Sequence, residues 1–146
     1  MCGRLAPQTM WRMRLTLPLL ATSAALLLVP AAAQAGTVSY VGDTLVFQAA
    51  PGERNDPFFD KADDGRLTIV EEGTTFPAVC EQDGGWGPIY CPMPTKLVVQ
   101  LGDGEDGNGF GSSFPAIPVE VYGGDGRDIL QTYGATNALL DGGPGN

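Results

Sequence analysis

Histidine is absent from this chain of 146 residues, and basic side chains are scarce, with eight against 17 acidic ones. Without histidine, no Ser-His-Asp or Cys-His nucleophile can be built, and the HExxH zinc motif is excluded. The net charge of −9 argues against nucleic acid or an anionic membrane surface as a partner. If a metal ion binds, the excess of carboxylate oxygens favours a hard cation such as calcium.

The segment 1–35 has the pattern of a secretory signal peptide. Three arginines between positions 4 and 14 precede an apolar stretch over residues 15–29, and an A-x-A cleavage motif occupies residues 33–35. A membrane anchor is the alternative, because residues 15–33 carry no charge and are just long enough to span a bilayer. The prolines at 18 and 30 and the small residues before the cleavage motif favour cleavage.

After cleavage, the exported chain is expected to begin at Gly36. Contact with a membrane is expected only from the signal peptide, before it is removed. Translation starts at Met1, Met10 or Met13. The part from Gly36 onward keeps all 17 acidic side chains but only five basic ones, which gives a formal charge of −12. Such a chain repels itself unless cations neutralise it.

Two cysteines, Cys80 and Cys91, remain after cleavage. An even number in an exported chain predicts a structural disulfide. The bond would close a short loop and contribute about 3 kcal/mol in the chain-entropy model. Trp86 and Tyr90 lie within this loop, and we expect them to pack over the disulfide.

Short β-strands separated by turns are the predicted secondary structure. β-rich runs cover residues 37–41 and 44–48 on either side of a Gly-Asp turn, and further runs cover 66–70, 96–101 and 119–122. No long window after the signal peptide keeps a helical apolar period free of glycine and proline. The predicted class is all-β.

The Gly/Asp clusters form a repeat. Residues 123–131 fit the nonapeptide G-G-x-G-x-D-x-U-x at every fixed position, with Leu130 as the large apolar residue U. Partial copies cover residues 101–106, with Asn108 at U, and residues 132–140, with Asn137 for the aspartate and Leu139 at U. A last copy begins at Gly142 and stops just short of its aspartate.

These motifs resemble the hemolysin-type (RTX) calcium-binding repeat family over residues 97–146. The resemblance implies a parallel β-roll, in which coils of two nonapeptides stack and calcium lies between successive turns. The intervals between its glycine turns at 102, 124 and 143 are each close to the length of one such coil, so the turns would lie on one edge. Asp128 belongs to the complete repeat, and we therefore expect it to matter more than Asp106.

The calcium ligands that the resemblance implies come from three turns. They are Leu101, Asp103, Gly104, Asp106, Gly123, Asp125, Gly126, Asp128, Gly142, Pro144 and Gly145.

Residues 60–71 are a second calcium candidate. They match the EF-hand loop at five positions, with Asp60, Asp64 and Glu71 as carboxylate ligands. One ligand position is Ala62, and nearby prolines and glycines leave no room for two flanking helices. A turn at Asp64-Gly65 that leads into a strand is therefore favoured.

The sequence predicts three parts, namely a signal peptide over residues 1–35, a β-rich N-terminal cap with one disulfide over 36–95, and RTX-like repeats over 96–146 that stop within a copy. The predicted function is calcium binding by an exported, calcium-stabilised β-roll with a structural or surface adhesion role. We predict no enzymatic activity, because short strands offer little wall for a substrate cleft. The alternatives are a secreted β-domain that binds a protein or glycan partner without calcium, or a fragment of a larger exported enzyme.

Overall fold

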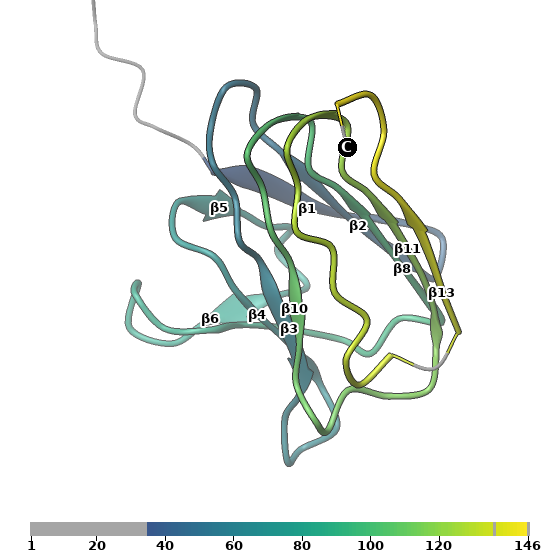
Figure 1. Cartoon of the computed structure of the whole chain (residues 1–146). Helices are drawn as coiled ribbons and strands as arrows, with labels where there is room; N and C mark the ends of the chain where they lie inside the picture. The colour runs from purple at the N-terminus through teal and green to yellow at the C-terminus, as the bar shows by residue number, and fades with distance from the viewer. Residues whose placement is uncertain (1–34, 136, 146) are drawn as a thin grey trace, which may run out of the picture. The chain divides into compact units, whose positions relative to one another are not determined.

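The computed structural model describes residues 35–135 and 137–145, all within a compact unit that spans Ala31–Asn146. The predicted signal peptide lies outside the described residues, apart from Ala35. The described part contains 13 β-strands and no helix, so the all-β class is confirmed (Figure 1). Helices long and apolar enough to cross a membrane are accordingly absent from residues 35–135 and 137–145.

The strands are β1 (Gly36–Val41), β2 (Thr44–Ala49), β3 (Phe58–Lys61), β4 (Leu67–Val70), β5 (Thr74–Thr75), β6 (Glu81–Gln82), β7 (Ile89–Cys91), β8 (Lys96–Gln100), β9 (Asp103–Gly104), β10 (Gly109–Phe110), β11 (Pro118–Tyr122), β12 (Asp125–Gly126) and β13 (Asn137–Asp141).

A six-stranded sheet with the order β13-β11-β8-β2-β1-β5 runs through the molecule. β1 and β2 form the antiparallel hairpin that the Gly42-Asp43 turn predicts. From β2 onward the pairing in the sheet is parallel. β2, β8, β11 and β13 all run in the same direction and lie side by side (Figure 1). Leu45, Leu97, Val119 and Ala138 occupy equivalent positions across these four strands.

The register of the parallel strands follows their apolar pattern. Leu45 and Leu97 are fully buried and Val119 is 1% exposed, whereas the residues that follow them, such as Val46 and Val98, are only partly buried. Because side chains alternate between the two faces of a strand, a shift by one position would expose the whole apolar set. Core burial therefore fixes which residues of successive strands lie beside each other.

The offsets between paired strands equal the spacings of the glycine turns. Leu97 pairs with Val119, and the interval between them in the chain is the same as that from Gly102 to Gly124. Val119 pairs in turn with Ala138, at the same interval as Gly124 to Gly143. A third sheet joins the turns themselves, since β9 pairs in parallel with β12. Each strand and the turn that follows it thus stack on their counterparts as one unit.

A five-stranded sheet with the order β10-β3-β4-β7-β6 contributes the second wall of the core. Phe47 on β2 meets Phe59 on β3 edge to face, with ring centroids 6.1 Å apart. Phe59 also stacks on Phe110 at 5.8 Å, and Phe110 contacts Phe114 at 4.7 Å. This row of rings joins the two sheets.

Strands from both sides of the predicted boundary at residue 95 pair with each other. β2 from the predicted cap lies beside β8 from the predicted repeats, and β3 lies beside β10. The segments that the sequence separates by composition therefore share their sheets and their core.

The predicted disulfide between Cys80 and Cys91 is formed, and both cysteines are buried. The bond links β7 to the residue before β6, and these two short strands pair as an antiparallel hairpin. Our expectation for Trp86 is wrong, because its side chain is 86% exposed and cannot pack over the disulfide. Tyr90 instead contacts Arg66, whose guanidinium lies 4.7 Å from the centre of the ring.

The assignment of residues 132–140 as a nonapeptide with Leu139 pointing inward is also wrong. Residues 137–141 form β13, in which Leu139 pairs with the partly buried Glu120 and is 51% exposed. Ala138 and Leu140 occupy the positions equivalent to the buried Val119 and Val121. The repeat pattern placed the apolar residue one position away from the face that the strand register selects.

Phe59 tests the aromatic row. Its side chain is fully buried between Phe47 and Phe110, so Phe59→Ala should lower the free energy of unfolding by about 3–5 kcal/mol. The adjacent Phe58 is 42% exposed, and Phe58→Ala should cost less than half as much. Chemical denaturation followed by circular dichroism measures both. Equal losses for the two variants would contradict the assigned core.

Candidate metal centre

The predicted glycine turns contact each other through their backbones. The N–H of Asp125 donates to the carbonyl of Gly102 at 2.8 Å. A Cβ atom at Gly124 would lie only 1.9 Å from that carbonyl oxygen, and one at Gly143 would lie 2.3 Å from the carbonyl oxygen of Gly124. The structure thus brings together the three turns that the spacing places on one edge.

A second level of contact follows two positions later. Gly126 has a φ angle of 129°, and a Cβ atom there would lie 1.6 Å from the carbonyl oxygen of Gly104. The N–H of Gly126 donates to the carbonyl of Pro144 at 3.3 Å, and Gly145 packs against Gly126 in the same way. Only glycine can adopt this backbone conformation and also fit in the space between these turns.

The two motif aspartates form a ladder along the stack. The Oδ1 atom of Asp106 accepts the backbone N–H of Asn55 at 2.8 Å, and the Oδ1 atom of Asp128 accepts the backbone N–H of Asp106 at 3.1 Å. Asp103 repeats the pattern nearby by accepting the N–H of Gly52 at 2.8 Å. Each of these carboxylates therefore binds the backbone of an earlier turn.

Asp106 is the most enclosed of these carboxylates. The residue is 3% exposed, and its Oδ2 atom has no hydrogen-bond partner among the described residues. Burial raises the pKa of Asp106, and the charges of Asp128 and Asp103 raise it further, against the N–H of Asn55 and the charge of Arg54. A buried acceptor without a donor costs about 1–3 kcal/mol, and more when it is charged.

Asn55 adds a second buried oxygen of the same kind. It is fully buried, its Nδ2 atom donates to the carbonyl of Glu53 at 3.2 Å, and its Oδ1 atom has no hydrogen-bond partner among the described residues. A Cβ atom at Gly104 would lie 2.9 Å from the Glu53 carbonyl oxygen and 3.1 Å from Asp106 Oδ1. Carbonyl and carboxylate oxygens therefore converge beside Gly104.

A similar group of oxygens lies one turn later. A Cβ atom at Gly123 would lie 2.4 Å from the Oδ2 atom of Asp128 and 2.9 Å from the carbonyl oxygen of Gly142. Gly123 also donates its N–H to the carbonyl of Asp141 at 2.8 Å. The turns of β8 and β11 thus each place a motif carboxylate beside backbone oxygens.

The other implied ligands divide into two groups. Leu101 is fully buried, and its N–H donates to the carbonyl of Tyr122, so this residue belongs to the core as well as to the turn. Asp103 and Asp125 are exposed neighbours on β9 and β12. No group of three or more His, Cys, Asp or Glu side chains suited to a metal ion occurs within the described ranges. A cation here would take most of its ligands from the backbone.

Two buried asparagines at this edge were missed as site residues in the sequence analysis. Asn108 is 1% exposed, and its amide donates to the carbonyl of Gln131 at 2.9 Å and accepts the N–H of Gln131 at 3.1 Å. Its position at U, where the repeat has a large apolar residue, was the only sequence signal. Asn55 gave none, because the Asp106 that it meets is far away in the chain.

The second calcium candidate is a β-hairpin, as the predicted turn implies. Asp60 lies in β3, opposite Thr68 of β4, and the loop between the strands turns at Gly65. The backbone N–H and the guanidinium of Arg66 lower the pKa of Asp64. Both carboxylate oxygens of Glu71 lie within 3.4 Å of the backbone N of Asp56, and burial raises the pKa of this side chain.

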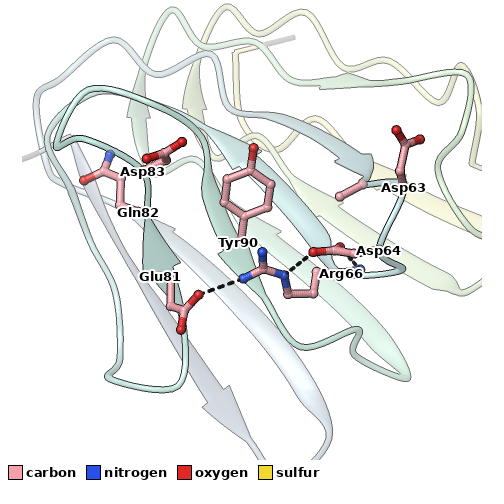
Figure 2. Close-up of a pocket in the computed structure, with 8 residues that line it drawn as sticks. Asp63, Asp64, Arg66, Glu81, Gln82, Asp83 and Tyr90 are labelled. Atoms are coloured by element: carbon pink, nitrogen blue, oxygen red, sulfur yellow. Dashed lines mark hydrogen bonds and ion pairs between the residues drawn. The ribbon is translucent and has the colours of Figure 1, made fainter.

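A cavity of about 640 Å³ lies between this hairpin and β6–β7 (Figure 2). Arg66 crosses it, with Nε 2.8 Å from Asp64, Nη1 3.0 Å from Glu81 and the guanidinium above the ring of Tyr90. The cavity therefore already holds a cationic group that belongs to the protein.

Comparison with protein-family models, with curated proteins and with solved structures finds no match to this chain.

The backbone contact at Gly124 can be tested with a matched glycine. Gly124→Ala adds a methyl group against the Gly102 carbonyl and should lower the free energy of unfolding by more than about 3 kcal/mol. Gly42 also has a positive φ, of 61°, but a Cβ atom there meets nothing within 4 Å. Gly42→Ala should cost only the conformational strain of about 1–2 kcal/mol. Similar costs in denaturation experiments would contradict direct stacking of the turns.

Proposed function

We propose that the protein is an exported calcium-binding module whose stacked glycine–aspartate turns hold calcium ions between successive turns. The observation that carries the proposal is Asp106 Oδ2, a buried oxygen without a hydrogen-bond partner that lies with the Glu53 carbonyl beside Gly104. Asn55, whose N–H binds the other carboxylate oxygen, has a buried Oδ1 that also lacks a partner. Neither oxygen has a donor among the described residues, and a cation beside Gly104 would satisfy the Asp106 oxygen. Asp128 supports a second position one turn later, beside the Gly142 carbonyl.

The chemistry of the donors favours calcium over other metals. All the candidate ligands are oxygens, the chain has no histidine, and the two cysteines that follow the predicted signal peptide are bonded to each other. Calcium takes six to eight oxygen ligands in flexible geometry and accepts backbone carbonyls readily. Magnesium demands a tighter octahedron and keeps its waters, so it should replace calcium poorly.

We further propose that the parallel strands belong to a β-roll of the RTX type. Three features support this proposal, namely the in-register ladder of β2, β8, β11 and β13, the strand offsets that equal the turn spacings, and the parallel pair β9–β12. In such an arrangement each additional turn would add further carboxylate and carbonyl oxygens as calcium ligands. A structural or surface adhesion role, without catalysis, follows from the same proposal, with a protein or glycan partner still to be identified.

Export is the third part of the proposal. Disulfides persist in oxidising compartments outside the cytosol, and the Cys80–Cys91 bond agrees with the signal peptide predicted over residues 1–35. Extracellular calcium modules bind with dissociation constants of about 10⁻⁴–10⁻³ M, so export itself would load the sites.

Asp106→Asn tests the calcium site. Asparagine keeps an acceptor for the Asn55 N–H but removes the buried charge, so the variant should be at least as stable as the natural chain in chelator. Calcium at about 100-fold over its dissociation constant should stabilise the natural chain by about 2.7 kcal/mol, and the variant by much less. Thermal unfolding and calorimetric titration with calcium measure both effects. Because Asp106 is the more buried aspartate, we now expect a larger effect here than from Asp128→Asn.

Asp43→Asn is the control, since Asp43 is exposed in the β1–β2 turn, away from the stacked turns. It should retain the full calcium effect. A natural chain that does not respond to millimolar calcium, or an Asp106→Asn variant that responds fully, would refute the site.

Processing gives a separate expected result. The exported product should begin at Gly36, and its intact mass should be lower than that of the reduced form by two hydrogen atoms, for one disulfide. Mass spectrometry of secreted material reads both quantities. Recovery of the chain with its apolar segment, residues 15–29, would refute cleavage.

A further inference from the structure

Trp86 is held in solvent on a fixed backbone. Among the large apolar side chains of the described residues that are exposed, its exposed fraction of 86% is the highest. The loop that carries it is closed by the buried disulfide and by two hydrogen bonds, from Gly87 N–H to the Asp83 carbonyl at 3.1 Å and from Gln82 Nε2 to the Gly87 carbonyl at 2.9 Å. The indole is thus presented at low cost in conformational entropy.

A cavity of about 310 Å³ lies beside this indole. Besides Trp86 it is lined by Glu71, Glu72 and Gln82, together with Val70 and three glycines. Its lining includes two carboxylates and no lysine or arginine. An aromatic side chain and two carboxylates therefore border the same space, and one of them, Glu71, also accepts the backbone N–H of Asp56.

The neighbouring cavity shows what such a grouping binds. Arg66 lies over Tyr90 and pairs with Asp64 and Glu81, which again combines one aromatic ring with two carboxylates (Figure 2). Gln82 lines both cavities, so the two groupings lie close together beside β6. The first grouping contains its own cation, whereas the lining of the Trp86 cavity supplies none.

We infer that the Trp86 cavity binds an organic cation, a guanidinium or ammonium group carried by a partner's side chain or by a small molecule. Trp86 supplies the ring face, and tryptophan is the best aromatic partner for a cation. Glu71 and Glu72 supply the opposing charge. The acidic chain, with a formal charge of −12 from Gly36 onward, raises the local concentration of such ligands.

Fluorescence of Trp86 reports binding directly. The chain has only one other tryptophan, Trp11, so the full chain carrying Trp11→Phe leaves Trp86 as the sole indole. With calcium held constant, N-acetyl-arginine amide and N-acetyl-lysine amide should change this fluorescence saturably in the millimolar range. N-acetyl-citrulline amide matches the arginine probe in shape but is neutral, and it should bind at least about tenfold more weakly, a difference of about 1.4 kcal/mol.

Variants identify the groups responsible, with calorimetry as the readout. Trp86→Ala should abolish binding of the arginine probe, and Glu71→Gln combined with Glu72→Gln should raise its dissociation constant at least about fivefold. Asp63→Asn is the matched control, because Asp63 is an exposed carboxylate of the neighbouring cavity, and it should leave the constant unchanged.

Further probes separate the sources of the cation. A short arginine-containing peptide that binds much more tightly than the amide would indicate a protein partner, and equal affinity would indicate a small molecule. Equal binding of the citrulline probe, binding of a methyl glycoside instead of the cations, or no saturable signal up to roughly 50 mM would overturn the inference.

Discussion

Backbone contact between successive glycine turns is the constraint on which the other features depend. At the strand spacing of roughly 4.8 Å, a Cβ atom at Gly124 or Gly143 would overlap the carbonyl oxygen of the preceding turn. The same spacing stacks Asp103 on Asp125. Like charges on neighbouring strands destabilise their pairing, and because both residues are exposed, water and salt screen this repulsion. Asp103 also accepts the backbone N–H of Gly52. A bound cation would reduce the remaining repulsion along the stack.

Negative charge links the two proposed binding activities. At the turn edge, carboxylate and carbonyl oxygens lie together beside Gly104 and Gly123, as the proposed inorganic ion requires. Beside Trp86, two carboxylates border an aromatic face, which suits a larger and more weakly hydrated cation. Arg66 neutralises carboxylates within the protein, because its guanidinium forms ion pairs with Asp64 and Glu81. If both proposals hold, negative charge is neutralised in three ways, by an inorganic ion, by an organic cation and by the chain's own arginine.

Local features of the sequence were predictable, and features that depend on distant contacts were not. The Gly42-Asp43 hairpin, the strands near residues 96–101 and 119–122, the disulfide and the turn spacing follow from short patterns or simple counts. Asn55 could not be found, because its role depends on a carboxylate in a distant part of the chain. Leu139 was placed on the wrong face because a repeat template does not fix a strand register to the exact position. Trp86 was placed over the disulfide because loop composition does not reveal which side chains the core can accept.

The unequal intervals of the parallel ladder have a consequence for how such a protein can change. Leu45 and Leu97 are adjacent in the sheet, although the hairpins of β3, β4, β6 and β7 lie between them in the chain. The later intervals, from Leu97 to Val119 and from Val119 to Ala138, are less than half as long, yet they keep the same register. Insertions between neighbouring parallel strands therefore leave the ladder intact, so a connection between two strands can be lengthened or replaced during evolution while the stacked glycine turns keep their positions.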